Sequence, residues 1–171
     1  TMGSLGIFVA TLYVGLALTA AGPRVVEFNV RFGDPDSQAV LARLTSPLAE
    51  LLHATATGTL SDAAGPTFTD DAACVVVLAA DGYPAAPVKG GQLTGIAEAE
   101  ARGVTVLHAG TRTEDDHLLA DGGRVLDVVA RGADLAHARE NAYAGLSLID
   151  LPGGWARTDI AAEAAAGRIT L

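Results

Sequence analysis

Apolar and polar positions along the first third of the chain predict one helix, one strand and a turn. Residues 7–20 form a nearly uninterrupted apolar run, for which we predict a helix buried on almost all sides. Gly22-Pro23 is expected to end that helix. Residues 24–32 then alternate apolar with polar side chains, which is typical of a strand. The following sequence GDPD, residues 33–36, predicts a sharp turn.

Two helices are predicted after the turn. The first covers residues 37–44, and Asp36 or Ser37 can cap its amino end. The second runs to about residue 57, with Ser46 as its N-cap and Pro47 in the first helical position. Residues 60–66 are loop-like, and we predict a domain boundary there.

The remainder of the chain mixes strands with helices. We predict strands at residues 73–80, 104–112, 115–120 and 124–132, helices at 96–102 and 134–148, and a short helix in the tail. Asp121-Gly122-Gly123 predicts a hairpin turn between the last two strands. The order of elements predicts an α/β (α+β) fold.

The apolar run at residues 7–20 has a second interpretation, a membrane-spanning segment. It is shorter than the roughly 20 residues that cross a bilayer, and no basic segment precedes it. Small residues interrupt it, which suits packing against a sheet. One strand and three helices cannot close a sheet, so we expect the first 60 residues to be the end of a larger domain that begins upstream.

Composition and charge limit the kinds of partner that this chain can bind. The 171 residues carry a net charge of -9, which disfavours nucleic acid and anionic membranes as partners, since both attract basic surfaces. Lys89 is the only lysine, so an anion site must use arginines and backbone N–H groups. A single cysteine, Cys74, excludes an intramolecular disulfide and fits a reducing compartment, the cytoplasm.

The strand at residues 24–32 carries the candidate chemistry. Alternation places Val26, Phe28, Val30 and Phe32 on the core face and Glu27, Asn29 and Arg31 on the other. That polar face can simply be solvated, with a Glu–Arg pair. Alternatively, one carboxylate and one amide oxygen suit Mg²⁺, and an arginine beside them suits phosphate.

These residues resemble a known family. The pattern E-x-N-x-R resembles the metal-binding strand of the ATP-grasp ligases. The longer string EFNVRFGDPDSQ is similar to the phosphoribosylamine–glycine ligases, the glycinamide ribonucleotide synthetases of purine biosynthesis. Further strings follow in the order of that family: SPLAELLHATATGTL, VVVLAADGYP, VLHAGT, GGRVLDVVARGADLAHARENAY and RTDI. The resemblance covers nearly the whole chain.

The resemblance implies a fold and an activity. Residues 1–62 would be the C-terminal portion of an ATP-grasp domain, and residues 66–171 the small mixed-sheet C-terminal domain. The family joins glycine to 5-phosphoribosylamine with ATP, through a glycyl phosphate, to give glycinamide ribonucleotide. Most of the nucleotide pocket would lie upstream, so this chain alone is expected to be inactive and to self-associate, whereas the full-length ligase is expected to be a monomer. The alternative is a non-catalytic structural or interaction module derived from such a ligase.

The resemblance also assigns roles. Glu27 and Asn29 would be ligands of Mg²⁺ or Mn²⁺, and Arg31 would stabilise charge on the transferring phosphoryl group. Asp34 and Asp36 could position glycine or the amine, although a turn and a helix cap explain them equally well. Lys89 could bind the ribose phosphate or be a solvated loop residue.

Overall fold

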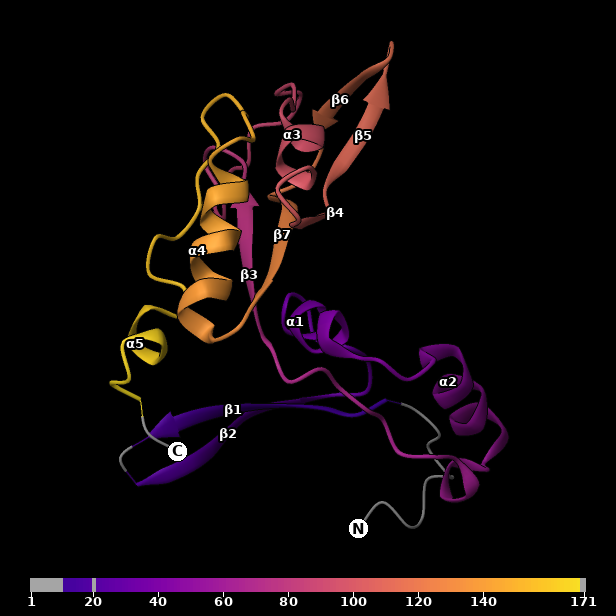
Figure 1. Cartoon of the computed structure of the whole chain (residues 1–171). Helices are drawn as coiled ribbons and strands as arrows, with labels where there is room; N and C mark the ends of the chain where they lie inside the picture. Colours follow the sequence, from indigo (N-terminus) through magenta and orange to yellow (C-terminus); the bar gives the residue numbers. More distant parts are fainter. Residues whose placement is uncertain (1–10, 20, 170–171) are drawn as a thin grey trace. The chain divides into compact units, whose positions relative to one another are not determined.

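The chain separates into two compact units. The computed structural model describes residues 11–19 and 21–169. The first unit contains the described residues up to Ser37 together with Leu44–Thr69, and the second contains Gln38–Arg43 together with the described residues from Asp70 onwards. Both units contain helices and strands (Figure 1). The predicted α/β (α+β) class is therefore confirmed.

The first unit begins with a β-hairpin where we predicted a helix. Strands β1 (Tyr13–Thr19) and β2 (Gly22–Asn29) pair antiparallel, with Tyr13 opposite Asn29. Gly22 makes the turn with a φ of 92°. The helix prediction is wrong for residues 13–19, and residues 7–10 and 20 lie outside the described part. An uninterrupted apolar run has no periodicity that would distinguish a helix from a strand. The partner strand, β2, lies just beyond the turn.

The predicted core face of residues 24–32 is exposed, contrary to the prediction. Val26 is 69% exposed, Phe28 65%, Val30 60% and Phe32 39%. Alternation indicates which positions are apolar and which are polar, but it cannot show whether another element covers a face. Within the first unit, these side chains do not form the core that we predicted.

Helices α1 (Asp36–Arg43) and α2 (Leu48–Thr57) confirm the two predicted helices, and a 3₁₀ turn, η1 (Leu60–Asp62), follows them. Gly58 ends α2 in the left-handed conformation that glycine favours. The predicted N-cap is wrong, since Pro47 takes that position without a side-chain cap. The Ser46 hydroxyl instead accepts a hydrogen bond from the Thr67 N–H at 3.1 Å.

The second unit is built on a three-stranded antiparallel sheet. Its order is β3 (Ala72–Ala79), β7 (Arg124–Gly132) and β4 (Thr105–His108), so the central strand comes last in sequence. The continuous apolar run in β3, and the apolar residues on both sides of Asp127 in β7, suit strands with both faces covered. Helix α4 (Leu135–Leu146) packs on one face, burying Ala138 and Ala142 against the sheet.

A second hairpin lies beside this sheet. Strands β5 (Thr111–Glu114) and β6 (His117–Ala120) pair through a turn at Asp115 and Asp116, both with positive φ. The predicted hairpin at residues 121–123 is therefore wrong: β7 pairs with β3 and β4 instead of β6. The reason is that Asp121-Gly122-Gly123 predicts a change in the direction of the chain but does not determine which strands pair.

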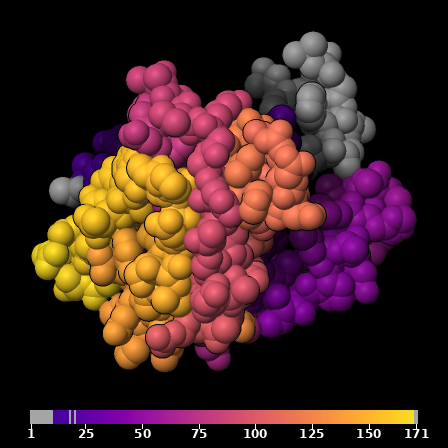
Figure 2. All heavy atoms as spheres, turned by 90° about the horizontal axis from the view of Figure 1, so that it is seen from above, coloured from indigo at the N-terminus to yellow at the C-terminus, as the bar shows by residue number. Residues whose placement is uncertain are grey.

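The loop after β3 joins distant parts of the second unit. Leu93 N–H donates to the Leu118 carbonyl at 2.9 Å, and Thr94 N–H donates to the Asp150 carbonyl at 3.1 Å. In the space-filling view, pink atoms from this part of the chain accordingly lie between orange and gold ones (Figure 2). Helix α3 (Ile96–Glu100) follows this loop.

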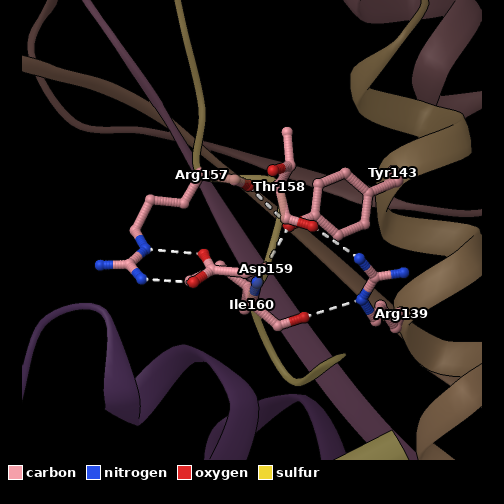
Figure 3. Close-up of polar contacts among 6 residues, drawn as sticks. All are labelled: Arg139, Tyr143, Arg157, Thr158, Asp159 and Ile160. Carbon is pink, nitrogen blue, oxygen red and sulfur yellow. Dashed lines mark hydrogen bonds and ion pairs between the residues drawn. The ribbon is translucent and has the colours of Figure 1, made fainter. Parts of the chain in front are cut away.

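Helix α4 also fixes the segment that precedes the last helix, α5 (Ala162–Ala165). Arg139 Nη2 donates to the Thr158 carbonyl at 2.6 Å, and its Nε donates to the Ile160 carbonyl at 2.9 Å. The Tyr143 hydroxyl donates to the Arg157 carbonyl at 2.6 Å (Figure 3). Two side chains one helical turn apart thus hold the backbone of residues 157–160, which we call the clamped segment.

Candidate active site

Strand β2 brings the two predicted metal ligands to one face. Glu27 lies opposite Gly15 and Asn29 lies opposite Tyr13 on β1. Because they are two residues apart on one strand, their side chains project to the same side. Glu27 is exposed and Asn29 is half-buried. A carboxylate and an amide oxygen therefore lie one strand repeat apart on an accessible surface.

Arg31 lies beyond the end of this strand. β2 ends at Asn29, and Arg31 sits in the bend that follows. Its Nη1 donates to the Phe32 carbonyl at 2.8 Å, and its side chain is exposed. The predicted strand thus ends earlier, because the chain must turn into the Gly33-Asp34-Pro35 segment. Alternation does not determine the direction of the guanidinium.

Tyr13 is a residue of this site that the sequence analysis missed. Its hydroxyl bonds to the Asp36 carboxylate, and this bond, partial burial and the negative charges of Asp36 and Glu27 raise the pKa of Tyr13. A Cβ on Gly33 would lie 3.0 Å from the Tyr13 ring, and one on Gly15 would lie 3.1 Å from Glu27 Cγ. These two glycines therefore leave room for the tyrosine and the glutamate.

The sequence shows Tyr13 within an apolar run, but this alone does not indicate that the residue belongs to the candidate site. A tyrosine in an apolar run is an ordinary strand residue. Its place beside Asn29 follows only from the pairing of β1 with β2, which we did not predict.

The turn carries the two predicted substrate-binding carboxylates. Asp34 precedes a cis-proline, and Ser37 N–H donates to the Gly33 carbonyl at 3.1 Å. Asp36 is the first residue of α1, where a carboxylate also interacts favourably with the helix dipole. Both residues are exposed. The structure thus agrees with the interpretation of these residues as a turn and the start of a helix, and both carboxylates remain accessible.

Lys89 lies in the second unit, whereas the other five predicted site residues lie in the first. Its Nζ is 3.3 Å from Asp121 Oδ1, and its side chain is 62% exposed. Hydrogen bonds flank it: Val88 N–H donates to the Asp81 carbonyl at 2.8 Å, and Gly90 N–H donates to the Ala120 carbonyl at 2.7 Å. The lysine is therefore held in an ordered loop.

The donor set fits a hard divalent cation. Among the described residues, no group of three or more His, Cys, Asp and Glu side chains could hold a metal ion. Such a group is not needed for Mg²⁺, which often takes one or two protein oxygens and completes its octahedron with water and substrate phosphate. Glu27 and Asn29 provide that number of oxygens.

Membrane insertion through a helix finds no support in the described residues. None of the helices there has both the length and the apolar composition needed to span a bilayer.

Comparison with known proteins identifies the family. Residues 73–163 match the family described as phosphoribosylglycinamide synthetase, C domain, and residues 4–37 match its ATP-grasp (A) domain. Phosphoribosylamine–glycine ligase of Mycobacterium tuberculosis is 55% identical over 165 residues, which are 96% of this chain and 38% of that protein. The ligase of Streptomyces coelicolor is 52% identical over 161 residues, which are 92% and 39%.

A solved structure of the same family is similar to this chain. The crystal structure of phosphoribosylamine–glycine ligase from Thermotoga maritima matches with a TM-score of 0.72 at 32% identity, over 87% of this chain and 36% of that one. The chain therefore spans between one third and two fifths of the length of the relatives it matches. It belongs to the phosphoribosylglycinamide synthetase family.

Proposed function

We propose that this chain contributes the metal-binding strand and the C-terminal domain of an ATP-dependent carbon–nitrogen ligase. The reaction joins glycine to 5-phosphoribosylamine and gives glycinamide ribonucleotide. The observation that carries the proposal is Glu27 and Asn29 on one accessible face of β2, inside the segment that matches the ATP-grasp domain. The names of the relatives supply the substrates.

In this proposal, Glu27 and Asn29 hold Mg²⁺ or Mn²⁺ through their side-chain oxygens. The metal, when bound, neutralises charge on the phosphates of ATP. Arg31 donates from its guanidinium to the transferring phosphoryl group and to the glycine carboxylate that receives it. An exposed guanidinium just beyond the metal ligands suits this role, because it binds phosphate and carboxylate oxygens in a bidentate manner.

The remaining predicted residues bind substrate in this proposal. Asp34 or Asp36 accepts a hydrogen bond from the ammonium group of glycine or from the attacking amine. Lys89, together with backbone N–H groups of its glycine-rich loop, binds the ribose phosphate. The ion pair with Asp121 is exposed on both sides, so a phosphate can replace that carboxylate at little cost.

The domain division is also a proposal. Residues 1–62 form the C-terminal portion of the ATP-grasp domain and residues 66–171 form the C-terminal domain. We propose a cytoplasmic location, a monomeric full-length ligase, and no nucleic acid or membrane partner.

Metal binding by the chain tests the proposal directly. We expect Mn²⁺ titration, followed by electron paramagnetic resonance, to show a site that Glu27→Gln and Asn29→Ala each weaken by about tenfold or more, since each variant removes one of two protein oxygens. Glu50→Gln changes an exposed carboxylate of α2 and should leave binding unchanged. Equal binding by all four proteins would contradict the assignment.

Activity of the chain alone gives a second test. Lys89 is its only lysine, and the match to the ATP-grasp domain covers residues 4–37 of this chain, so we expect no release of phosphate from ATP in the presence of glycine. Turnover comparable to that of an intact ligase would contradict this expectation. A chain that binds neither metal nor nucleotide would favour the alternative, a structural or interaction module.

A further inference from the structure

One charged side chain lies inside the second unit. Asp127, on β7, is 3% exposed and is the single buried charged or polar residue among those the structure describes. Its neighbours along the strand, Leu126 and Val128, are fully buried and apolar. A buried carboxylate is costly unless hydrogen bonds compensate the loss of water. Gln38 Nε2 donates such a bond to Asp127 Oδ2 at 2.9 Å.

Asp127 faces away from α4. Alternation along β7 directs Leu126 and Val128 to the face where α4 buries Ala138 and Ala142, and Asp127 to the opposite face. Gln38 comes from α1, and Gln38–Arg43 belongs to the same compact unit as the sheet. The hydrogen bond therefore joins α1 to the face of the sheet that α4 leaves uncovered.

Apolar packing of α1 on this face is incomplete. A pocket of about 300 Å³ remains, lined by Gln38, Leu41, Ala42, Thr105, Leu107 and Val129. No residue of α1 is buried. Apolar contact is not directional, so a loosely packed helix can rotate or slide on its support. A hydrogen bond between an amide and a carboxylate is directional and fixes one arrangement.

We infer that Asp127 is a positioning residue, which acts through Gln38 to fix α1 and the turn that precedes it. This inference rests on the proposed function, because α1 begins at Asp36, directly after Asp34 and Pro35. The side chain that holds the helix thus comes from the domain that matches the C domain, whereas the proposed substrate carboxylates come from the segment before it. Asp127 is itself not expected to touch substrate.

Exchanging the hydrogen-bond donor and acceptor between Gln38 and Asp127 tests the inference. Gln38→Glu places two carboxylates together, whereas the double variant with Asp127→Asn restores a donor and an acceptor in reversed positions. We expect hydrogen exchange of the α1 amides to accelerate about tenfold or more in Gln38→Glu and to return toward the wild-type rate in the double variant. The backbone NMR signals of Asp34 and Asp36 should move and return in parallel.

Controls separate this role from general stability. Gln92→Glu makes the same change on an exposed side chain of the second unit and should leave α1 unaffected. Amides of β3 and α4 should keep their exchange rates in every variant. Unchanged α1 exchange in Gln38→Glu, an equal change in β3 and α4, or no recovery in the double variant would overturn the inference. None of these measurements needs metal or nucleotide, so a failure of the Mn²⁺ titration leaves this test intact.

Discussion

At the scale of single residues, close contacts and local charges determine which substitutions the second unit tolerates. Gly145 is buried in α4, and a Cβ there would lie 2.7 Å from Val104 Cγ2 and 2.8 Å from Val104 Cγ1. Val104 is itself buried and β-branched, so its side chain has little freedom to move. Helix α4 approaches Val104, the residue before β4, this closely because the glycine has no side chain.

Gly145→Ala should therefore destabilise the protein, although alanine has the higher helix propensity. We expect a loss of about 1–3 kcal/mol in the free energy of unfolding, from denaturant titration. Val104→Ala in the same chain should recover part of that loss. Gly65→Ala, at a position with open space around it, should change stability by less than about 0.5 kcal/mol. A stabilised Gly145→Ala protein would contradict the contact.

The N-cap of α4 provides a pH-dependent contribution. Hydrogen bonds from the backbone N–H and the imidazole of His137 lower the pKa of Asp134, and the same carboxylate raises the pKa of His137. The carboxylate contribution is lost as pH falls through its lowered pKa. The histidine contribution is complete below its ordinary pKa of 6.5 and is lost as pH rises through the raised one. The pair is strongest between about pH 4 and pH 6.5.

His137→Ala should accordingly lower the melting temperature most near pH 5, by a few degrees, with the difference shrinking as pH rises above the raised pKa. Thermal melts across the pH range measure this. His53→Ala removes an exposed histidine of α2 that takes no part in this cap, and it should change the melting temperature little. A constant difference between wild type and His137→Ala at all pH values would exclude the ion pair as the cause.

At the scale of elements, the clamped segment depends on side chains of α4. The Arg139 guanidinium lies over the Tyr143 ring, 4.6 Å from its centroid, while both side chains bond to the backbone of residues 157–160. Beyond the clamp, Arg157 Nε donates to the Asp159 carboxylate at 2.8 Å (Figure 3). This exposed pair contributes little stability by itself, so the backbone bonds keep the segment in place.

Loss of the clamp should expose the Arg157–Thr158 peptide bond to trypsin. We expect cleavage there to be several-fold faster in Arg139→Met and in Tyr143→Phe than in wild type, because each variant removes a hydrogen bond to the segment. Mass spectrometry of timed digests measures the rate of cleavage at this peptide bond separately from cleavage at other sites. Arg102→Met removes an exposed arginine near α3 and should leave its rate unchanged. Equal rates in all four proteins would show that the clamp does not order the segment.

At the scale of the whole molecule, the hairpin of β1 and β2 exposes several large apolar side chains. Leu16, Val25, Val26 and Phe28 are each more than half exposed on β1 and β2, and both strands of this two-stranded sheet are edge strands. Contiguous apolar surface and open strand edges both favour association. We therefore retain the proposal that this chain self-associates, and we propose that it does so through the hairpin.

Light scattering at increasing protein concentration tests this proposal. We expect the average mass to rise with concentration for the wild type, and the rise to diminish in a Val26→Lys/Phe28→Lys variant. Val88→Lys changes an equally apolar exposed residue in a loop of the second unit and should associate as the wild type does. A wild-type chain that stays monomeric at high concentration would exclude the proposal.

The sequence alone determined the elements whose signals are local. The strand β3, the helix α4 and the helix α2 with its glycine stop follow from runs, periodicity and a cap, which need no distant partner. The proposed metal ligands Glu27 and Asn29 likewise come from a pattern within one strand, and the strings around them identified the family that the comparisons then confirmed.

Only the tertiary structure decided which strands pair and which faces are covered. Residues 13–19 became a strand because β2 offered a partner, and β7 joined β3 and β4 although β6 precedes it in sequence. Tyr13 reached Asn29 and Asp36, and Gln38 reached Asp127, through these non-local contacts. Pairing and burial depend on residues far apart in the chain, so no local pattern can specify them.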